Sequence, residues 1–229
     1  MSAHDPADLQ RIYGARFTRQ AAYRQAVWRV LIGDFFQQFI APSDRVLDLG
    51  CGYGEFINQI RCAAKFGMDL NPDTAARLAP DVRFLRQDCS ARWPLEVGSL
   101  DAVFTSNFFE HLPDKAALGR TFDEIVRCLA PGGRLIAMGP NIKFLPGSYW
   151  DFWDHYVPLT EKSLVEAFTT RGLAIERCED RFLPYTMSDG PQYPTAFLRL
   201  YLRLPLAWKL MGRQFLVVAQ KQAMPPGGA

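Results

Sequence analysis

Three glycines that follow a short apolar run constrain this chain more than any other feature of its sequence. Residues 45–49 are mostly apolar, and Gly50, Gly52 and Gly54 come directly after them at alternate positions. Such a run is typical of a buried parallel strand, and the glycines let the backbone turn sharply and approach a ligand. In an open α/β sheet this turn lies at the carboxyl edge, where ligands bind. The cluster therefore predicts both a fold class and the place of a binding site.

Apolar runs alternate with segments of helical spacing between residues 45 and 138. Strands are predicted at residues 45–49, 66–69, 82–85, 101–105 and 134–138. Helices are predicted at residues 55–60, from the capping residue Asn71 onward, and between Asp114 and Ala130. This alternation favours a parallel sheet with helices on both faces, and the right-handed crossover rule favours a doubly wound topology.

The pattern is looser after residue 139. Residues 140–158 form a loop rich in aromatic side chains, and a capped helix is predicted from Thr160 to Thr170. Two further strands, at residues 173–177 and 214–219, bring the predicted sheet to seven strands. The expected fold class is thus α/β, with a doubly wound, mostly parallel seven-stranded sheet.

Three segments are expected around this sheet. Residues 1–40 are predicted to form an N-terminal helical lid, residues 41–221 the ligand-binding domain with an insertion at about 181–212, and residues 222–229 a disordered tail. Within the insertion, residues 196–213 alternate leucines with arginines, which fits a strand, but their basic residues also gather on one side of a helical wheel. Peripheral membrane contact, a homodimer interface and packing on the chain's own core all remain open for this segment.

Composition excludes several classes of function. The chain has 229 residues, 48% of them hydrophobic, and a formal net charge of +2, which does not favour nucleic-acid binding. Five cysteines without metal or redox spacing, no secretory signal and no membrane-spanning run predict a cytoplasmic protein with reduced thiols. Its histidines, His4, His111 and His155, are far apart in the sequence, so no metal site is predicted.

The residue after the glycines argues against a dinucleotide. A dinucleotide fingerprint needs its third glycine at position 55, where this chain has Glu55. A carboxylate beside a pyrophosphate would be repelled. The phosphate-binding interpretation is therefore weakened.

Several ordered segments resemble the class I S-adenosylmethionine-dependent methyltransferases, over roughly residues 9–221. The first motif of that family is an acidic residue at the end of strand one followed by alternate glycines, as are Asp48 and the three glycines here. Residues 105–114 resemble the segment after the family's fourth strand, and residues 129–135 resemble the start of its fifth. The resemblance implies a doubly wound methyltransferase fold and S-adenosylmethionine as the cofactor.

The resemblance also implies a set of cofactor-binding residues. In the family, an acidic residue closing the second strand binds the ribose hydroxyls, where Asp69 stands, and one after the third strand binds the adenine amino group, where Asp88 stands. Plainer roles remain open, since Asp69 can cap a helix, Asp88 can form a turn and Cys89 can serve packing. The implied residues are Asp48, Gly50, Cys51, Gly52, Gly54, Asp69, Leu70, Asp88, Cys89, Ser106 and Asn107.

The acceptor side is expected in the aromatic loop. Residues 149–160 are similar to bacterial methyltransferases of glycan and small-molecule biosynthesis, which implies O-methylation of a sugar, a glycan or a lipid-linked or other small molecule. An alcohol acceptor must lose a proton as its oxygen attacks. His155 is the predicted proton acceptor and His111 the second candidate, with structural roles open for both.

Two other functions stay open at this point. The chain could bind S-adenosylmethionine without catalysis, as a partner subunit, and methyl turnover would separate that function from an enzyme. A nicotinamide oxidoreductase is the third hypothesis, and cofactor titration would test it.

Overall fold

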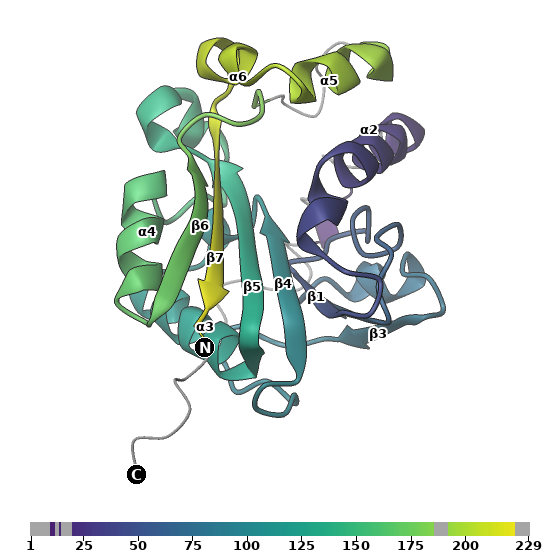
Figure 1. Cartoon of the computed structure of the whole chain (residues 1–229), viewed down its shortest axis with the longest axis vertical. Helices are drawn as coiled ribbons and strands as arrows, with labels where there is room; N and C mark the ends of the chain where they lie inside the picture. Colours follow the sequence, from purple (N-terminus) through teal and green to yellow (C-terminus); the bar gives the residue numbers. More distant parts are fainter. Residues whose placement is uncertain (1–9, 12–13, 15–19, 186–191, 223–229) are drawn as a thin grey trace.

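The computed structural model describes residues 10, 11, 14, 20–185 and 192–222. Within them the chain forms one sheet with helices on both faces (Figure 1). Most of the predicted lid before residue 20, and all of the predicted tail except residue 222, lie outside the described residues. The division into a lid, a ligand-binding domain and a tail stays a prediction.

Seven strands form the sheet in the described part of the chain, which confirms the predicted fold class. They are β1 (Arg45–Leu49), β2 (Ala64–Met68), β3 (Val82–Leu85), β4 (Leu100–Ser106), β5 (Leu129–Pro140), β6 (Leu173–Glu179) and β7 (Gln214–Lys221). Their order is β3-β2-β1-β4-β5-β7-β6; β1 to β5 are parallel, and β7 runs antiparallel to β5 and β6. The order reverses between β1 and β4, so the carboxyl ends of these two strands border the position where doubly wound sheets bind ligands.

Both faces of the sheet are buried. In β1, Val46 belongs to one apolar cluster and Leu47 to the other, because successive side chains point to opposite faces. Helices α3 (Lys115–Cys128) and α4 (Glu161–Thr169) pack on the Leu47 face, and α2 (Ala21–Asp34) with the 3₁₀ helix η1 (Phe36–Phe39) packs on the Val46 face (Figure 1). Burial on both faces explains why central strands such as β1 and β4 have apolar runs, whereas the edge strand β6 mixes apolar and charged residues.

Local polar motifs begin the helices where the sequence predicts. The Asp114 carboxylate accepts a hydrogen bond from the Ala117 N–H at 2.7 Å at the start of α3. Thr160 and Ser163 form a capping box at the start of α4. Helix α3 ends at Cys128 and not at Ala130, because the next residue already pairs with β4 as the first residue of β5.

Two predicted helices are wrong in type. Residues 55–60 form turns, in which the N–H groups of Asn58 and Ile60 donate to carbonyls four residues earlier at 3.0 Å. So short a segment does not complete a regular helix, because the first turn fixes several residues for each hydrogen bond gained. The segment after Asn71 is the 3₁₀ helix η2 (Pro72–Ala76), capped by Asn71 as predicted. The other 3₁₀ helices are η3 (Phe109–His111), η4 (Ile142–Phe144) and η5 (Ser148–Asp151).

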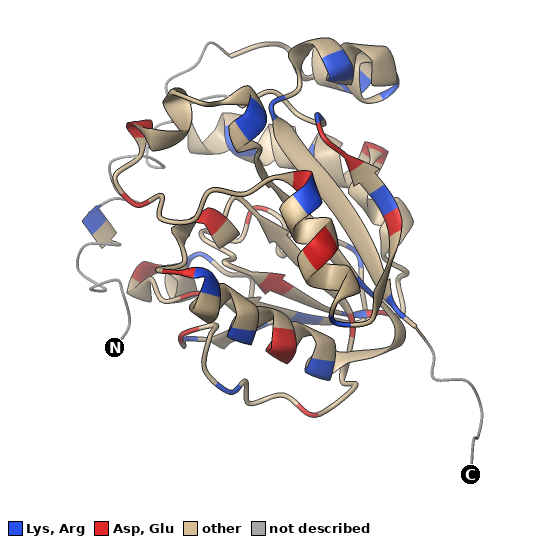
Figure 2. Cartoon of the chain, turned by 90° about the vertical axis from the view of Figure 1, so that its left-hand side faces the viewer, with Lys and Arg blue, Asp and Glu red and all other residues tan. Residues whose placement is uncertain are grey.

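The insertion between β6 and β7 contains two helices, α5 (Thr195–Leu202) and α6 (Pro205–Met211). The strand interpretation of residues 196–213 is therefore wrong, because Pro205 breaks the run and starts α6. Their inward side chains pack on the Val46 face, and Figure 2 shows these two helices carrying Lys and Arg only, whereas charges of both signs mix elsewhere. Among the described residues, every helix is too short or too polar to span a lipid bilayer.

We expect Phe104→Ala to destabilise the fold by about 3–5 kcal/mol, the usual cost of removing a buried aromatic ring. Phe104 is 1% exposed and stacks on Phe56 with ring centroids 3.7 Å apart. Urea unfolding followed by circular dichroism measures the change. The matched control is Phe197→Ala, whose ring is 62% exposed, and its expected effect is within about 0.5 kcal/mol. Equal losses in both variants would contradict this assignment of the core.

Candidate functional site

The glycine turn after β1 has a conformation that only glycine adopts without strain. Gly50, Gly52 and Gly54 have φ angles of 70°, 53° and 78°. A Cβ at Gly50 would lie 2.2 Å from the Phe108 ring, so a side chain there would also displace Phe108. The missing side chain thus allows the segment after β4 to pack directly on the turn.

Asp69 ties this turn to the end of β2. Its carboxylate accepts hydrogen bonds from the N–H groups of Gly52 and Asn71, both at 2.8 Å, and the side chain is buried. Asp69 is not the cap of η2, because Asn71 has that role. The acidic residue is thus at the glycine turn, and its binding of ribose hydroxyls stays a prediction.

Three carboxylates gather at the turn. Burial, reinforced by the charges of Glu55 and Asp69, raises the pKa of the Asp48 carboxyl well above its usual value. Burial, reinforced by the charges of Asp48 and Asp69, also raises the pKa of the Cys51 thiol. Glu55 forms an ion pair with Arg24 of α2. A cationic ligand at this turn would therefore be favoured over an anionic one.

The residues implied for the adenine follow β3, which is separated from β1 by β2 in the sheet order. Asp88 makes a local turn, since its carboxylate accepts a hydrogen bond from the Ser90 N–H at 2.8 Å. Cys89 is buried: its carbonyl accepts from the Trp93 indole, and its sulfur accepts from the Thr121 hydroxyl. These contacts agree with the plainer roles of a turn residue and a packing residue. Leu70, the residue after Asp69, is half-buried. Contact of the cofactor with Leu70, Asp88 and Cys89 stays a prediction.

Asn107 has a strained backbone at the end of β4. Its φ is 50°, in the left-handed region, and its N–H donates to the Met138 carbonyl of β5 at 2.9 Å. The side-chain amide donates to the Ser106 hydroxyl, whereas its buried Oδ1 has no hydrogen-bond partner among the described residues. An unpartnered acceptor beside the switch point is what a bound ligand would use.

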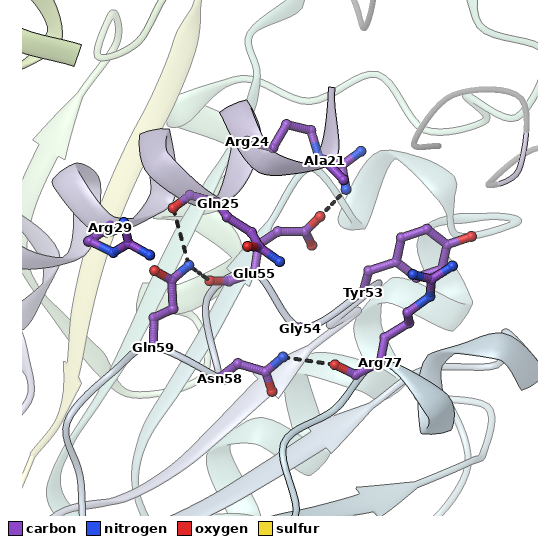
Figure 3. Close-up of a pocket in the computed structure, with 10 residues that line it drawn as sticks. All are labelled: Ala21, Arg24, Gln25, Arg29, Tyr53, Gly54, Glu55, Asn58, Gln59 and Arg77. Carbon is purple, nitrogen blue, oxygen red and sulfur yellow. Dashed lines mark hydrogen bonds and ion pairs between the residues drawn. The ribbon is translucent and has the colours of Figure 1, made fainter. Parts of the chain in front are cut away.

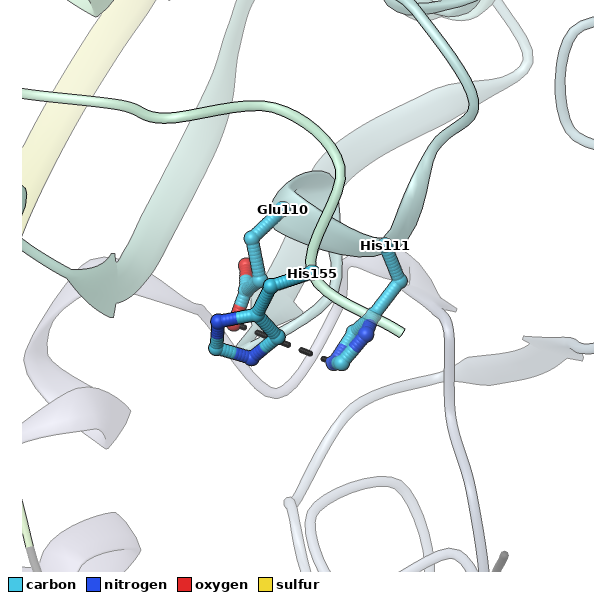
Figure 4. A group of neighbouring side chains, drawn as sticks. All are labelled: Glu110, His111 and His155. Atoms are coloured by element: carbon cyan, nitrogen blue, oxygen red, sulfur yellow. Dashed lines mark ion pairs between the residues drawn. The ribbon is translucent and has the colours of Figure 1, made fainter. Parts of the chain in front are cut away.

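His111 and His155 meet in space, although they are far apart in the sequence (Figure 4). Their ring centroids are 4.9 Å apart. The Glu110 carboxylate points toward them, and one ligand atom from each of the three residues lies within 4.8 Å of the others. The sequence predicts no metal site because its histidines are far apart along the chain, whereas the fold brings two of them together with Glu110.

Hydrogen bonds from the aromatic loop hold this cluster together. The Glu110 carbonyl accepts from the N–H groups of Tyr156 and Val157 at 2.9 and 3.2 Å. The His111 Nδ1 lies 2.8 Å from the Asp154 carbonyl oxygen, and the His155 ring stacks on Phe152. The loop after β5 therefore lies against the segment after β4, as expected of two carboxyl ends at one sheet edge.

Glu110 is a site residue that the sequence prediction missed. Its side chain is 1% exposed, and burial, opposed by the nearby His111, raises the pKa of its carboxyl to about 7. Burial alone would lower the pKa of His111, but its hydrogen bond with Asp154 and the charge of Glu110 raise it overall. The available signal was the Glu-His pair directly after the fourth strand.

A shallow cavity of about 280 Å³ lies between α2 and the glycine turn (Figure 3). Gly54 and Tyr53 form its floor on the turn side, and Arg24 and Arg29 reach it from α2. Gln59 bridges the two sides, since its amide donates to the carbonyls of Gln25 and Glu55. The helix predicted as part of a lid thus contacts the turn directly.

Comparisons with known proteins agree with this arrangement. Residues 47–137 match the family described as methyltransferase domain. The chain is 28% identical to demethylmenaquinone methyltransferase of Symbiobacterium thermophilum over 57% of each protein. It is 36% identical to chloroplastic tocopherol O-methyltransferase of Arabidopsis thaliana over 40% of this chain and 29% of that one. The chain therefore spans less than two thirds of either relative.

A solved structure has the same fold over nearly the whole chain. It is a chain of the complex between the Trm112 methyltransferase activator of Haloferax volcanii and a methyltransferase. The TM-score is 0.68 at 19% identity, and the match covers 93% of this chain and 97% of that one. This chain therefore has the fold of that structure, and its residues 47–137 match a methyltransferase domain.

We expect Asp69→Ala to weaken binding of S-adenosylmethionine at least tenfold. Two charge-assisted hydrogen bonds to the ribose would be lost, each worth on the order of 1.5–3 kcal/mol before compensation. Isothermal titration should give micromolar affinity for the unaltered chain and no binding of NAD. The control is Asp73→Ala, an exposed carboxylate nearby, with unchanged affinity. Unchanged affinity in a folded Asp69→Ala variant would mean that Asp69 serves only the backbone of the turn.

Proposed function

We propose that this chain transfers the methyl group of S-adenosylmethionine to a hydroxyl group of a small molecule. The observation that carries the proposal is the contact of Phe108 with the glycine turn, two residues before Glu110. It connects the predicted donor site to the cluster of Glu110, His111 and His155. Donor and acceptor groups would then meet at the carboxyl ends of β1 and β4.

Positioning supplies most of the rate in this mechanism. The sulfonium is a good leaving group, so alignment of the acceptor oxygen with the methyl carbon is the main requirement. The oxygen forms a bond to the methyl carbon, the sulfur keeps the electron pair of the broken bond, and the acceptor proton is lost at the histidine pair. Carboxylates at the turn favour the cationic donor over its neutral product, which helps product leave.

The acceptor is proposed as a small molecule with an apolar face. Trp150 and Trp153 on the loop are 51% and 87% exposed, and aromatic side chains of this kind can stack on sugars or on aromatic rings. One relative is named a demethylmenaquinone methyltransferase and another a tocopherol O-methyltransferase, and both names favour a lipophilic molecule with a ring. The second name alone favours a hydroxyl as the acceptor group. The narrower expectation of a sugar or glycan stays a prediction.

We expect His155→Ala to lower turnover about 100-fold while leaving donor affinity unchanged. The ring stacks on Phe152 of the loop after β5, which is the proposed acceptor side. The measurement is formation of S-adenosylhomocysteine with a panel of quinols, phenols and sugars. His111→Ala is the companion variant, and a loss confined to it would move the proton acceptor to the segment after β4. Near-normal rates in both variants would contradict a histidine and favour Asp151, Asp154 or water.

A non-catalytic donor-binding subunit is the second function, and the same assay tests it. Donor binding without turnover of any acceptor would support that function. No observation on the described residues favours it over the enzyme.

We also propose an anionic lipid surface as the partner of α5 and α6. Phe197, Leu200, Leu206 and Leu210 are 56–83% exposed, and residues 192–213 contain basic but no acidic residues. Leu206→Asp with Leu210→Asp should reduce co-sedimentation with phosphatidylglycerol vesicles several-fold, with no binding to phosphatidylcholine. Val97→Asp, another exposed apolar site at 69%, is the control. A concentration-dependent dimer that loses its interface in the same variant would contradict this proposal.

A further inference from the structure

We propose that Glu110, His111 and His155 bind one divalent transition metal ion of the Zn²⁺ type. The inference deepens the proposed methyl transfer, because it names what activates the acceptor at that site. It concerns the three side chains of Figure 4, which come from the segments after β4 and β5.

The donor set has the chemistry of a catalytic metal site. Two imidazoles and one carboxylate are the protein ligands of many catalytic zinc sites, which leave a further position for water or substrate. The His111 Nε2 lies 4.0 Å from the Glu110 Oε1. This distance is too long for a hydrogen bond, but ligand atoms around one ion with bonds of about 2.0–2.2 Å lie roughly 3–4 Å apart. A small contraction would bring both atoms to one ion.

His111 is oriented as metal-binding histidines are. Its Nδ1 faces Asp154, at 2.8 Å from the carbonyl oxygen and 3.2 Å from the carboxylate Oδ2. A ligating histidine commonly donates its second ring N–H to a carboxylate or carbonyl, which fixes the ring and makes the other nitrogen a better ligand. Asp154 thus directs the Nε2 of His111 toward Glu110.

The buried carboxylate of Glu110 has fewer polar partners than the buried carboxylate of Glu161. Its Oε1 has no hydrogen-bond partner among the described residues. By contrast, Glu161 is also buried, but it forms an ion pair with Lys143 and accepts a hydrogen bond from Asn141 at 2.7 Å. A buried carboxylate oxygen that accepts no hydrogen bond is costly, and a divalent cation bound to it would remove that cost. The contrast is what points to an ion at Glu110.

An ion in this place would change how the acceptor loses its proton. A hydroxyl oxygen that coordinates a Zn²⁺ ion becomes more acidic, so its proton can pass to water near neutral pH. His111 and His155 would then act as ligands, and the oxygen would attack the methyl carbon while the sulfur keeps the electrons of the broken bond. The three residues explain acceptor activation together, whereas a single histidine base leaves Glu110 without a role.

The test is titration of the chelator-treated full chain with Zn²⁺ by calorimetry. We expect one ion per chain in the unaltered protein, binding at least tenfold weaker in Glu110→Gln and in His155→Ala, and a higher melting temperature with the ion present. Glu161→Gln is the matched control and should bind as the unaltered chain does. Cys178→Ser controls for the exposed thiol. Binding of S-adenosylhomocysteine shows that each variant is folded.

Each result separates this inference from the proposed function. No zinc binding to the unaltered chain, or equal binding by Glu110→Gln, overturns the metal site and leaves methyl transfer by a histidine base intact. Zinc binding that depends on Cys178 also overturns it. Failure of the chain to bind S-adenosylmethionine overturns the proposed function, whereas the zinc result would still stand.

Discussion

The contact between Gly50 and Phe108 is the constraint on which the rest of the site depends. A side chain at position 50 would occupy the space of the Phe108 ring, so the turn and the segment after β4 can touch only because that side chain is absent. Phe108 leads directly into η3, which carries Glu110 and His111. The glycine required by a left-handed turn therefore also sets the distance between the two halves of the site.

Polar groups at this sheet edge are held by backbone contacts more than by opposite charges. Asp69 is satisfied by two N–H groups, and the Glu110 carbonyl receives two more from the aromatic loop. The carboxyl groups of Asp48 and Glu110 are also buried at this edge. Burial disfavours their charged form and raises the pKa of both. A cation would stabilise the charged form of both carboxyl groups. The proposed cation is a sulfonium beside Asp48 at the turn and a metal ion beside Glu110 at the histidines.

The sequence predicts the sheet well because its signals are local. Apolar runs and helix caps act within a few residues, and the structure confirms the predicted cap at Asn71. The helices predicted from Asp114 and from Thr160 do begin there, with these two residues as their caps. The helix predicted at residues 55–60 is wrong, because apolar spacing does not show whether a segment is long enough to form a helix. The meeting of His111 with His155 could not be predicted from spacing, since it depends on β4 and β5 being neighbours in the sheet.

Helices α2 and α6, which pack on the Val46 face of the sheet, connect the glycine turn to the surface. Arg24 of α2 pairs with Glu55 of the turn, and the same face of the sheet holds Trp208 of α6 against Phe35 at the end of α2. The turn is joined to α2 by more than that ion pair, since Gln59 donates to the Gln25 carbonyl and the Phe56 ring packs against Trp28 of α2. A displacement of α6 would therefore reach both α2 and the glycine turn through packed rings, because closely packed side chains transmit a shift to their neighbours.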